Sequence, residues 1–268
     1  MRSFYHDEGA FLFVIRIGGY SVTTIAVIAD IHGNVWALEA VLADIQRRGI
    51  TTIINLGDHV YGPMAPAATI ERILREPMMN ISGNEDRCLF LPVDEAVNFS
   101  SYHFVRSQLN AEQLAWLEAL PQTTIVGDIF CCHGTPDSDT TYMLETVTEH
   151  GVSLTSGERI HTYLEGITQS VVVCGHTHIP RTVWMPDGWQ VVNPGSVGWP
   201  AYSDDTPYPH VMEAGSPHAR YSILEQQPNG WWNVEHVALV YDWAQAAAAC
   251  RRSGREDWAH WIETGRGR

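Results

Sequence analysis

The chain has 268 residues, a formal net charge of −15, 45% apolar residues and no lysine. This length suffices for one large domain or two small ones, and the apolar content is ordinary for a globular protein. The negative charge argues against nonspecific binding to nucleic acids or to anionic membranes. It does not exclude a phosphorylated substrate, because bound divalent cations would reverse the sign of the charge locally.

The five cysteines follow no spacing typical of a zinc site or a disulfide framework. We therefore expect reduced, buried thiols and a cytoplasmic protein. No apolar run approaches the roughly 18–20 residues of a membrane-spanning helix, so we expect no membrane association. We predict that residues 1–22 form an N-terminal extension and that residues 23–268 form a single domain.

The first half of the chain alternates between strands and helices. Residues 25–29 form a short apolar run typical of a buried strand, and apolar residues at a 3.6-residue spacing predict a helix over 35–48. The alternation continues, which predicts a parallel sheet. The further predicted elements are strands over 51–56 and 78–82, helices over 65–75, 101–108 and 110–120, and a hairpin over 123–132.

The second half is richer in hairpins. A helix is predicted over 156–165, with Ser156 as its N-cap, and a four-residue apolar strand over 171–174. Residues 201–218, rich in Pro, Asp, His and Ser, are predicted to form a long loop. The remaining predicted elements are hairpins over 182–192 and 221–237 and two helices over 242–251 and 256–263.

Side chains suited to metal binding follow the predicted strands. Asp30 and His32 come directly after the first strand, and alternate side chains of an extended segment point the same way, so the two can converge. The carboxyl end of a buried strand is where an α/β protein places its binding site. The complete set is Asp30, His32, Asp58, Asn84, His133, His176 and His178.

This ordered set resembles the calcineurin-like metallophosphoesterases over about residues 25–198. The stretches NLGD at 55–58, HGTP at 133–136 and NPGSVG at 193–198 resemble the small prokaryotic phosphodiesterase branch of that superfamily. The resemblance implies an α/β (α+β) fold, a four-layer αββα sandwich in which two mixed β-sheets are flanked by helices.

The resemblance also implies two divalent metal ions, with Asp58 bridging them. A bridging carboxylate keeps two dications about 3.5–4 Å apart and lets them lower the pKa of a shared water. Mixed nitrogen and oxygen ligands favour Mn, Fe, Zn or Ni over Mg. The implied ligands are Asp30, His32, Asp58 and His178 for one ion and Asp58, Asn84, His133 and His176 for the other. The expected catalytic residues are Asp58, Asn84 and His133, together with Glu85 at the position that follows Asn84.

The chain departs from the family pattern at Glu85, where the family usually has a histidine that helps to protonate the leaving group. A carboxylate beside two dications has a depressed pKa and would be a poor acid at neutral pH. Alternatively, Glu85 opens a helix and points away from the site. His59 and His103 are candidate substitutes for the missing acid, with a structural or solvent-exposed histidine as the alternative reading of each.

The leading functional hypothesis is a metal-dependent phosphoric ester hydrolase, which cleaves phosphodiesters or activated phosphoesters by attack of a metal-bridging hydroxide. One alternative is a non-catalytic, metal-binding interaction scaffold on the same fold. Another is a nucleotide or dinucleoside-polyphosphate hydrolase. The expected partner is a small phosphoester, and the sequence leaves open whether the chain forms a homo-oligomer.

Overall fold

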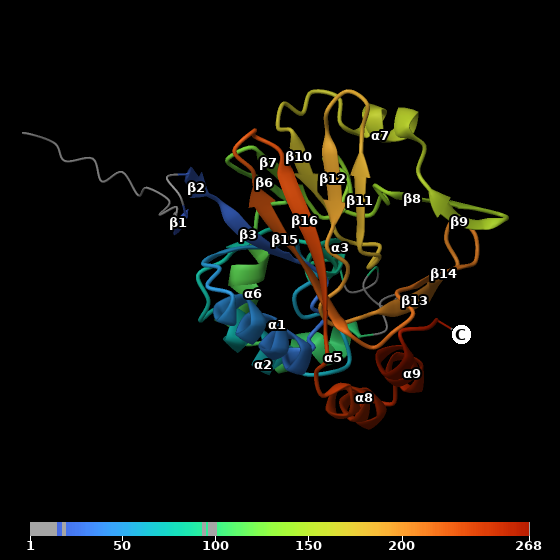
Figure 1. Cartoon of the computed structure of the whole chain (residues 1–268). Coiled ribbons are helices and arrows are strands. Elements are labelled where there is room, and N and C mark those ends of the chain that lie inside the picture. The colour runs from blue at the N-terminus through green and yellow to red at the C-terminus, as the bar shows by residue number, and fades with distance from the viewer. Residues whose placement is uncertain (1–14, 18–19, 93–94, 96–100, 268) are drawn as a thin grey trace, which may run out of the picture.

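Two five-stranded mixed sheets face one another, with helices outside them (Figure 1). The structure, a computed structural model, describes residues 15–17, 20–92, 95 and 101–267. The predicted four-layer sandwich is confirmed. Residues 1–14 of the predicted N-terminal extension lie outside the described residues, and residues 15–17 and 20–22 form the short antiparallel strands β1 (Ile15–Ile17) and β2 (Tyr20–Val22). The boundary at residue 23 stays a prediction.

The first sheet has the strand order β16-β15-β3-β4-β5. Its three strands β3, β4 and β5 run parallel, and β15 and β16 are antiparallel to their neighbours. The carboxyl ends of β3, β4 and β5 therefore meet at one edge of the sheet. The bounds are β3 (Thr24–Ile28), β4 (Thr52–Asn55), β5 (Met79–Asn80), β15 (Ala219–Gln226) and β16 (Trp232–Leu239).

The second sheet has the order β11-β12-β10-β7-β6. Here β7, β10 and β12 run parallel, while β6 and β11 are antiparallel edge strands. The bounds are β6 (Thr123–Val126), β7 (Ile129–Cys132), β10 (Val171–Val173), β11 (Arg181–Trp184) and β12 (Gln190–Asn193). The predicted hairpin over 123–132 is confirmed.

The core is layered because buried strands present alternate side chains to opposite faces. Ile25 and Val27 of β3 pack between the two sheets, whereas Ala26 and Ile28 pack against the helices outside the first sheet. In β10, Val172 packs on the outer face of the second sheet. Apolar residues on both faces explain why these strands read as continuous apolar runs.

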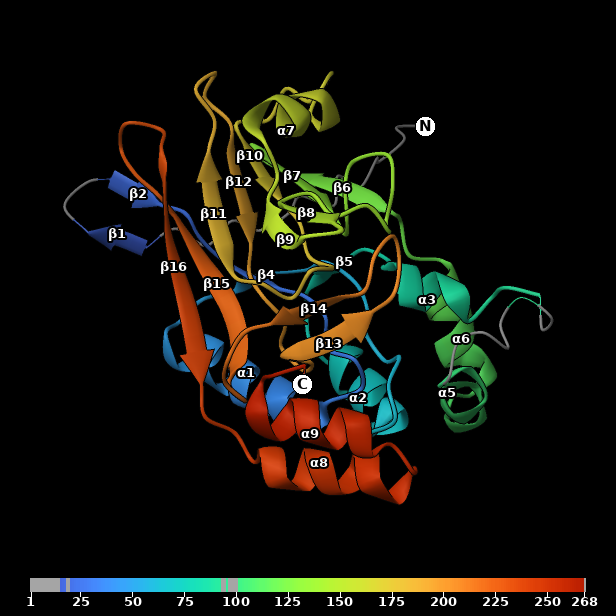
Figure 2. The same ribbon diagram turned by 90° about the vertical axis from the view of Figure 1, so that its right-hand side faces the viewer.

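Helices cover both outer faces (Figures 1 and 2). The cluster outside the first sheet includes side chains of α1, α8 and α9, while α7 supplies Ile160 to the cluster outside the second. Ser156 caps α7 through the Arg159 amide, as predicted. The bounds are α1 (Val35–Arg47), α2 (Pro66–Ile73), α3 (Asn84–Cys88), α5 (Tyr102–Gln108), α6 (Ala111–Glu118), α7 (Gly157–Tyr163), α8 (Trp243–Arg252) and α9 (Glu256–Thr264).

The predicted long loop over 201–218 is wrong. Residues 201–218 contain an antiparallel hairpin of β13 (Ala201–Asp204) and β14 (His210–Glu213). Tyr202 and Met212 lie opposite one another in this hairpin, and their burial stabilises it. A second hairpin that the sequence did not indicate pairs β8 (Glu145–Thr148) with β9 (Gly151–Leu154). Figure 2 brings both hairpins to the front of the molecule.

Across the described residues, the structure contains no helix with the length and apolarity that crossing a bilayer requires.

Candidate metal centre

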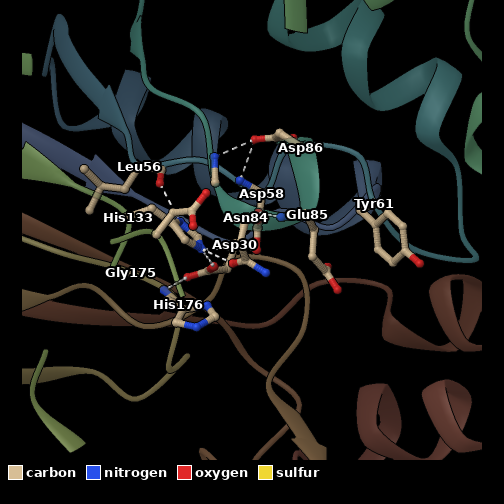
Figure 3. A network of polar contacts seen from close by, with 12 residues as sticks. Asp30, Leu56, Asp58, Tyr61, Asn84, Glu85, Asp86, His133, Gly175 and His176 are labelled. Atoms are coloured by element: carbon tan, nitrogen blue, oxygen red, sulfur yellow. Dashed lines mark hydrogen bonds and ion pairs between the residues drawn. The ribbon is translucent and has the colours of Figure 1, made fainter. Parts of the chain in front are cut away.

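The structure brings all seven candidate ligands together at the carboxyl ends of the central strands. Asp30 and His32 follow β3, Asp58 follows β4, and His133 directly follows β7. Asn84 begins α3 just after β5, and His176 and His178 follow β10. Figure 3 shows carboxylate, amide and imidazole groups from both sheets pointing toward a common region.

The backbone at this site is held in an unusual conformation. Among the described residues, every non-glycine residue with a positive φ is one of the candidate ligands. Residues other than glycine rarely adopt the left-handed backbone conformation. Each such residue costs of order 1–3 kcal/mol of folding free energy and persists only where its surroundings enforce the conformation. Such strain concentrates at functional sites. The residues are Asp30, His32, Asp58, His176 and His178, with φ of 56°, 51°, 55°, 70° and 62°.

Backbone carbonyl groups orient three of the imidazoles. The Nδ1 atoms of His32, His133 and His178 lie 2.9, 2.8 and 2.6 Å from the carbonyl oxygens of Tyr61, Leu56 and Trp199. A carbonyl only accepts, so each Nδ1 carries a proton, and Nε2 is the ring nitrogen left to bind a metal ion. This is the arrangement by which proteins orient metal-binding histidines.

The first group of donors converges on buried Asp30. Its Oδ1 has no hydrogen-bond partner and lies 3.5 Å from Nε2 of His178 and 4.0 Å from Nε2 of His32. The two Nε2 atoms are only 3.2 Å apart. With both Nδ1 atoms protonated, the carboxylate and the two Nε2 atoms face one another, an arrangement that needs a proton or a metal ion between them. The donor set therefore fits a divalent ion.

The second group is built around Asp58. Its Oδ2 lies 3.3 Å from Nε2 of His133 and 3.8 Å from Nε2 of His32, so the carboxylate stands between the two groups. The Asn84 side-chain oxygen is 3.0 Å from the same His133 nitrogen. Donor atoms of Asp58, His133 and His176 all lie within 4.8 Å of one another.

The charges of the site are strongly coupled. Burial opposes protonation of His133, but Asp58 and Asp30 outweigh it and raise the pKa of His133 to about 10. Burial and the neighbouring His133 lower the pKa of His176 to about 4. For Asp58, burial is outweighed by His133 and His32, which hold its pKa below the usual range. The buried carboxylates thus favour positive charge here, and metal ions compete with protons for the same atoms.

Asp86, which sequence reasoning did not assign, supports the loop that carries Asp58. Its carboxylate accepts hydrogen bonds from the backbone amides of Asp58, His59 and Gly83 at 2.9–3.0 Å. A carboxylate three residues after Gly83 at the start of a helix was the available signal.

Two glycines let the Asp58 loop pack against the start of α3. Gly57 has φ 101°, in the left-handed region, and a Cβ on Gly83 would overlap the Asp58 carboxylate and its backbone amide. The lack of a side chain at Gly83 therefore sets the position of Asp58.

We expect Gly83→Ala to lower the hydrolytic activity that the sequence predicts by on the order of 10–100-fold, because small displacements of catalytic groups have such effects. Gly157→Ala is the matched control, since a Cβ there meets only the Met185 methyl at 3.7 Å. Steady-state kinetics on both variants would measure the effect, and equal activities would show that Gly83 does not position Asp58.

Glu85 lies in the first turn of α3, as one reading of the sequence predicted, but it does not point away from the site. Its carboxylate oxygen is 3.0 Å from Nδ1 of His32, and the side chain lines a cavity that opens onto the candidate ligands. Figure 3 shows it extending beside Asn84. Among protein groups alone, burial raises the pKa of Glu85 to about 7, while His32 opposes the rise.

The two substitute histidines have different surroundings. His59 is fully buried, with Nδ1 2.7 Å from an Asp86 oxygen and Nε2 3.2 Å from the Asn80 side-chain oxygen. These contacts give it a structural role. His103 is exposed on α5, where its ring contacts Tyr102. Neither histidine lines the cavity at the candidate metal centre.

A cavity of about 210 Å³ opens onto the candidate ligands. Part of its wall was missed by sequence reasoning because it comes from segments without a motif, including the hairpin strand β13. These wall residues are Tyr142, Trp199, Tyr202, Ser203 and Asp204. The position of Trp199, directly after the NPGSVG stretch, was the one available signal.

Comparison with known proteins identifies the class. The calcineurin-like phosphoesterase superfamily domain matches residues 24–213, so the chain belongs to this superfamily. The predicted family is confirmed. Membership and the buried His/Asp groups identify a metal-binding phosphoesterase, that is, a hydrolase.

Two similar proteins cover nearly the whole chain. A metallophosphoesterase from Sphaerobacter thermophilus, known from its crystal structure, is 26% identical and has a TM-score of 0.70, covering 91% of this chain and 100% of that one. An uncharacterised protein from Methanocaldococcus jannaschii is 25% identical over 263 residues, covering 87% of this chain and 94% of the relative.

Proposed function

We propose that the chain is a phosphodiesterase that uses two divalent metal ions, and that it also cleaves activated phosphomonoesters. The observation that carries the proposal is the convergence of buried imidazole nitrogens and carboxylate oxygens around Asp30 and Asp58, where a metal ion can replace a proton. Mn, Fe, Zn or Ni suits the mixed nitrogen and oxygen donors better than Mg.

We assign Asp30, His32 and His178 to one ion, Asn84, His133 and His176 to the other, and Asp58 to both. When bound, the metals would supply a water of lowered pKa and neutralise the phosphoryl oxygens. The chain's own residues hold this arrangement. The carbonyls of Tyr61, Leu56 and Trp199 orient the imidazoles, and Asp86 fixes the Asp58 loop.

Asp58 and Asn84 are the central members of the proposed catalytic set. Oδ1 of Asp58 accepts a hydrogen bond from the Glu85 amide at 2.9 Å, which leaves Oδ2 directed toward His133. The Asn84 oxygen approaches the same histidine, so its amide nitrogen can donate to a phosphoryl oxygen. Glu85 borders the cavity, and among the described residues no arginine or lysine lines it to attract phosphate. The negative charge of Glu85 therefore favours substrates of low negative charge.

Purified protein incubated with Mn and 4-nitrophenyl esters tests the proposal. We expect metal-dependent release of nitrophenolate from diesters, abolished by a chelator and restored by Mn. Absence of turnover with every diester and monoester would contradict the proposal and favour the scaffold alternative.

Glu85→His is expected to raise the rate for monoesters with poor leaving groups, such as phenyl phosphate, by roughly ten-fold or more. A positioned general acid contributes about 10²–10⁴-fold, and only a poor leaving group needs the proton. The rate for 4-nitrophenyl phosphate should change much less, which makes it the internal control. An unchanged or lower rate for phenyl phosphate would show that Glu85 does not occupy the position of a missing acid.

A further inference from the structure

The wall of the metal-centre cavity combines aromatic rings with carboxylates. Trp199 and Tyr202 have ring centroids 5.3 Å apart, and Trp199 is held in place by stacking on Trp258 at 3.8 Å. Tyr142 lies on the same wall, with its ring centroid 4.9 Å from that of His176. The rings therefore form a rigid apolar surface beside the candidate metal ligands.

The tyrosine hydroxyl groups of this wall are already used within the protein. Nδ1 of His210 lies 2.8 Å from the Tyr208 carbonyl, which places its proton there and leaves Nε2 as an acceptor. The Tyr142 hydroxyl, 3.2 Å away, donates to that Nε2 and accepts from the Tyr202 hydroxyl at 2.9 Å. The indole nitrogen of Trp199 is buried. The two tyrosines thus offer no free donor to an additional phosphate group.

Outside the candidate ligands, the charged groups of the cavity wall are acidic. Glu85 and Asp204 both line it, and Asp204 is exposed at the mouth on β13. No arginine lines the cavity in the part of the chain that the structure describes, and the chain has no lysine. Away from the candidate ligands, a second phosphate would therefore meet carboxylates, aromatic rings and the Ser203 hydroxyl without a cationic side chain, whereas an ammonium group would be attracted to the rings and the carboxylates.

We propose that the substrate is a small phosphodiester in which one ester group carries an ammonium ion, such as a choline or ethanolamine ester. This inference rests on the proposed function and specifies its substrate class. The aromatic wall and Asp204 hold the ammonium group while the phosphoryl group lies at the metal centre. In hydrolysis, a water oxygen bonds to phosphorus, the bond from phosphorus to one ester oxygen breaks, and the departing oxygen takes a proton from water.

The cavity volume agrees with this assignment. Pockets for drug-sized ligands measure about 300–1,000 Å³, and this cavity is smaller. It accommodates a small ammonium ester better than a dinucleoside polyphosphate, which is larger and carries several negative charges. The cavity volume thus favours the proposed substrate over the nucleotide alternative.

The kinetic test compares two substrates that differ only in charge: 4-nitrophenyl phosphorylcholine and its neutral isostere, 4-nitrophenyl 3,3-dimethylbutyl phosphate. We expect kcat/KM to be about ten-fold higher for the choline ester, mainly through a lower KM, because the aromatic rings of the wall attract the cation. Asp204→Asn should reduce this preference to about three-fold or less. Asp187→Asn, in the turn before β12 and far from the cavity, removes one charge as a control and should preserve the preference.

A binding measurement separates this inference from the proposed function. Calorimetry on the metal-loaded protein should show tighter binding of phosphocholine than of 3,3-dimethylbutyl phosphate by a similar factor. That preference without turnover of either diester would support the ammonium site and contradict the phosphodiesterase. Equal affinities, equal kcat/KM values, or faster turnover of a dinucleoside polyphosphate than of the choline ester would overturn the inference.

Discussion

Asp58→Asn is expected to lower kcat/KM for 4-nitrophenyl diesters by on the order of 10³-fold, about 4 kcal/mol of transition-state stabilisation. Asparagine keeps the shape of the side chain and can still accept the Glu85 amide hydrogen bond that Oδ1 now accepts. What is lost is the negative charge between His133 and His32, the two histidines that lie on either side of Oδ2. Without that charge the two metal ions lose their shared ligand.

The measurement combines steady-state kinetics with metal analysis of the same protein sample. We expect the bound metal to fall from two ions per chain to one or fewer as the rate falls. Asp187→Asn controls for the loss of one carboxylate. Asp187 is exposed, and within the described residues its one ion pair is with His161. A loss smaller than ten-fold, with both ions retained, would show that Asp58 does not bridge the metals.

Removal of metal is expected to lower the melting temperature by about 5–15 °C. A ligand present at 100–1,000 times its Kd stabilises by about 2.7–4.1 kcal/mol, and a chain of this size shifts by roughly 2–4 °C per kcal/mol. The structural reason is the buried, unpartnered Oδ1 of Asp30 and the close approach of the His32 and His178 nitrogens. A cation stabilises these groups in the folded chain far more than in the unfolded one.

Thermal melting after dialysis against a chelator, and again after Mn is restored, measures this effect. The melting temperature should recover with Mn, and Asp58→Asn should gain less from Mn than the unaltered protein. The same melting temperature with and without metal would mean that the convergent donors do not bind an ion.

Part of the candidate metal centre was predictable from the topology of the sheets. The carboxyl ends of parallel strands meet at one edge, which places Asp30 and Asp58 together at the first sheet. His133 follows a strand of the second sheet, and the family resemblance, not the strand order, implied that it joins them. Apolar runs that pack on both faces, such as Val171–Val173, identify those strands without knowledge of their neighbours.

The cavity wall was not predictable from composition. Residues 201–213, which include Tyr202 and Asp204, contain many polar residues and two prolines, and this composition favours a loop. They nevertheless pair as β13 and β14 because Tyr202 and Met212 are buried together. The direction of Glu85 was equally open, since a residue in a first helical turn can face either side and the packing of α3 decides it. Long-range packing determines these features.

Anomalous diffraction from crystals of the protein loaded with Mn tests the central claim most directly. We expect two Mn peaks about 3.5–4 Å apart, one on each side of the Asp58 carboxylate. One peak should lie beside Asp30 and His178, and the other beside His133 and His176. A single peak, or peaks outside this cluster, would contradict the binuclear centre on which the proposed activity depends.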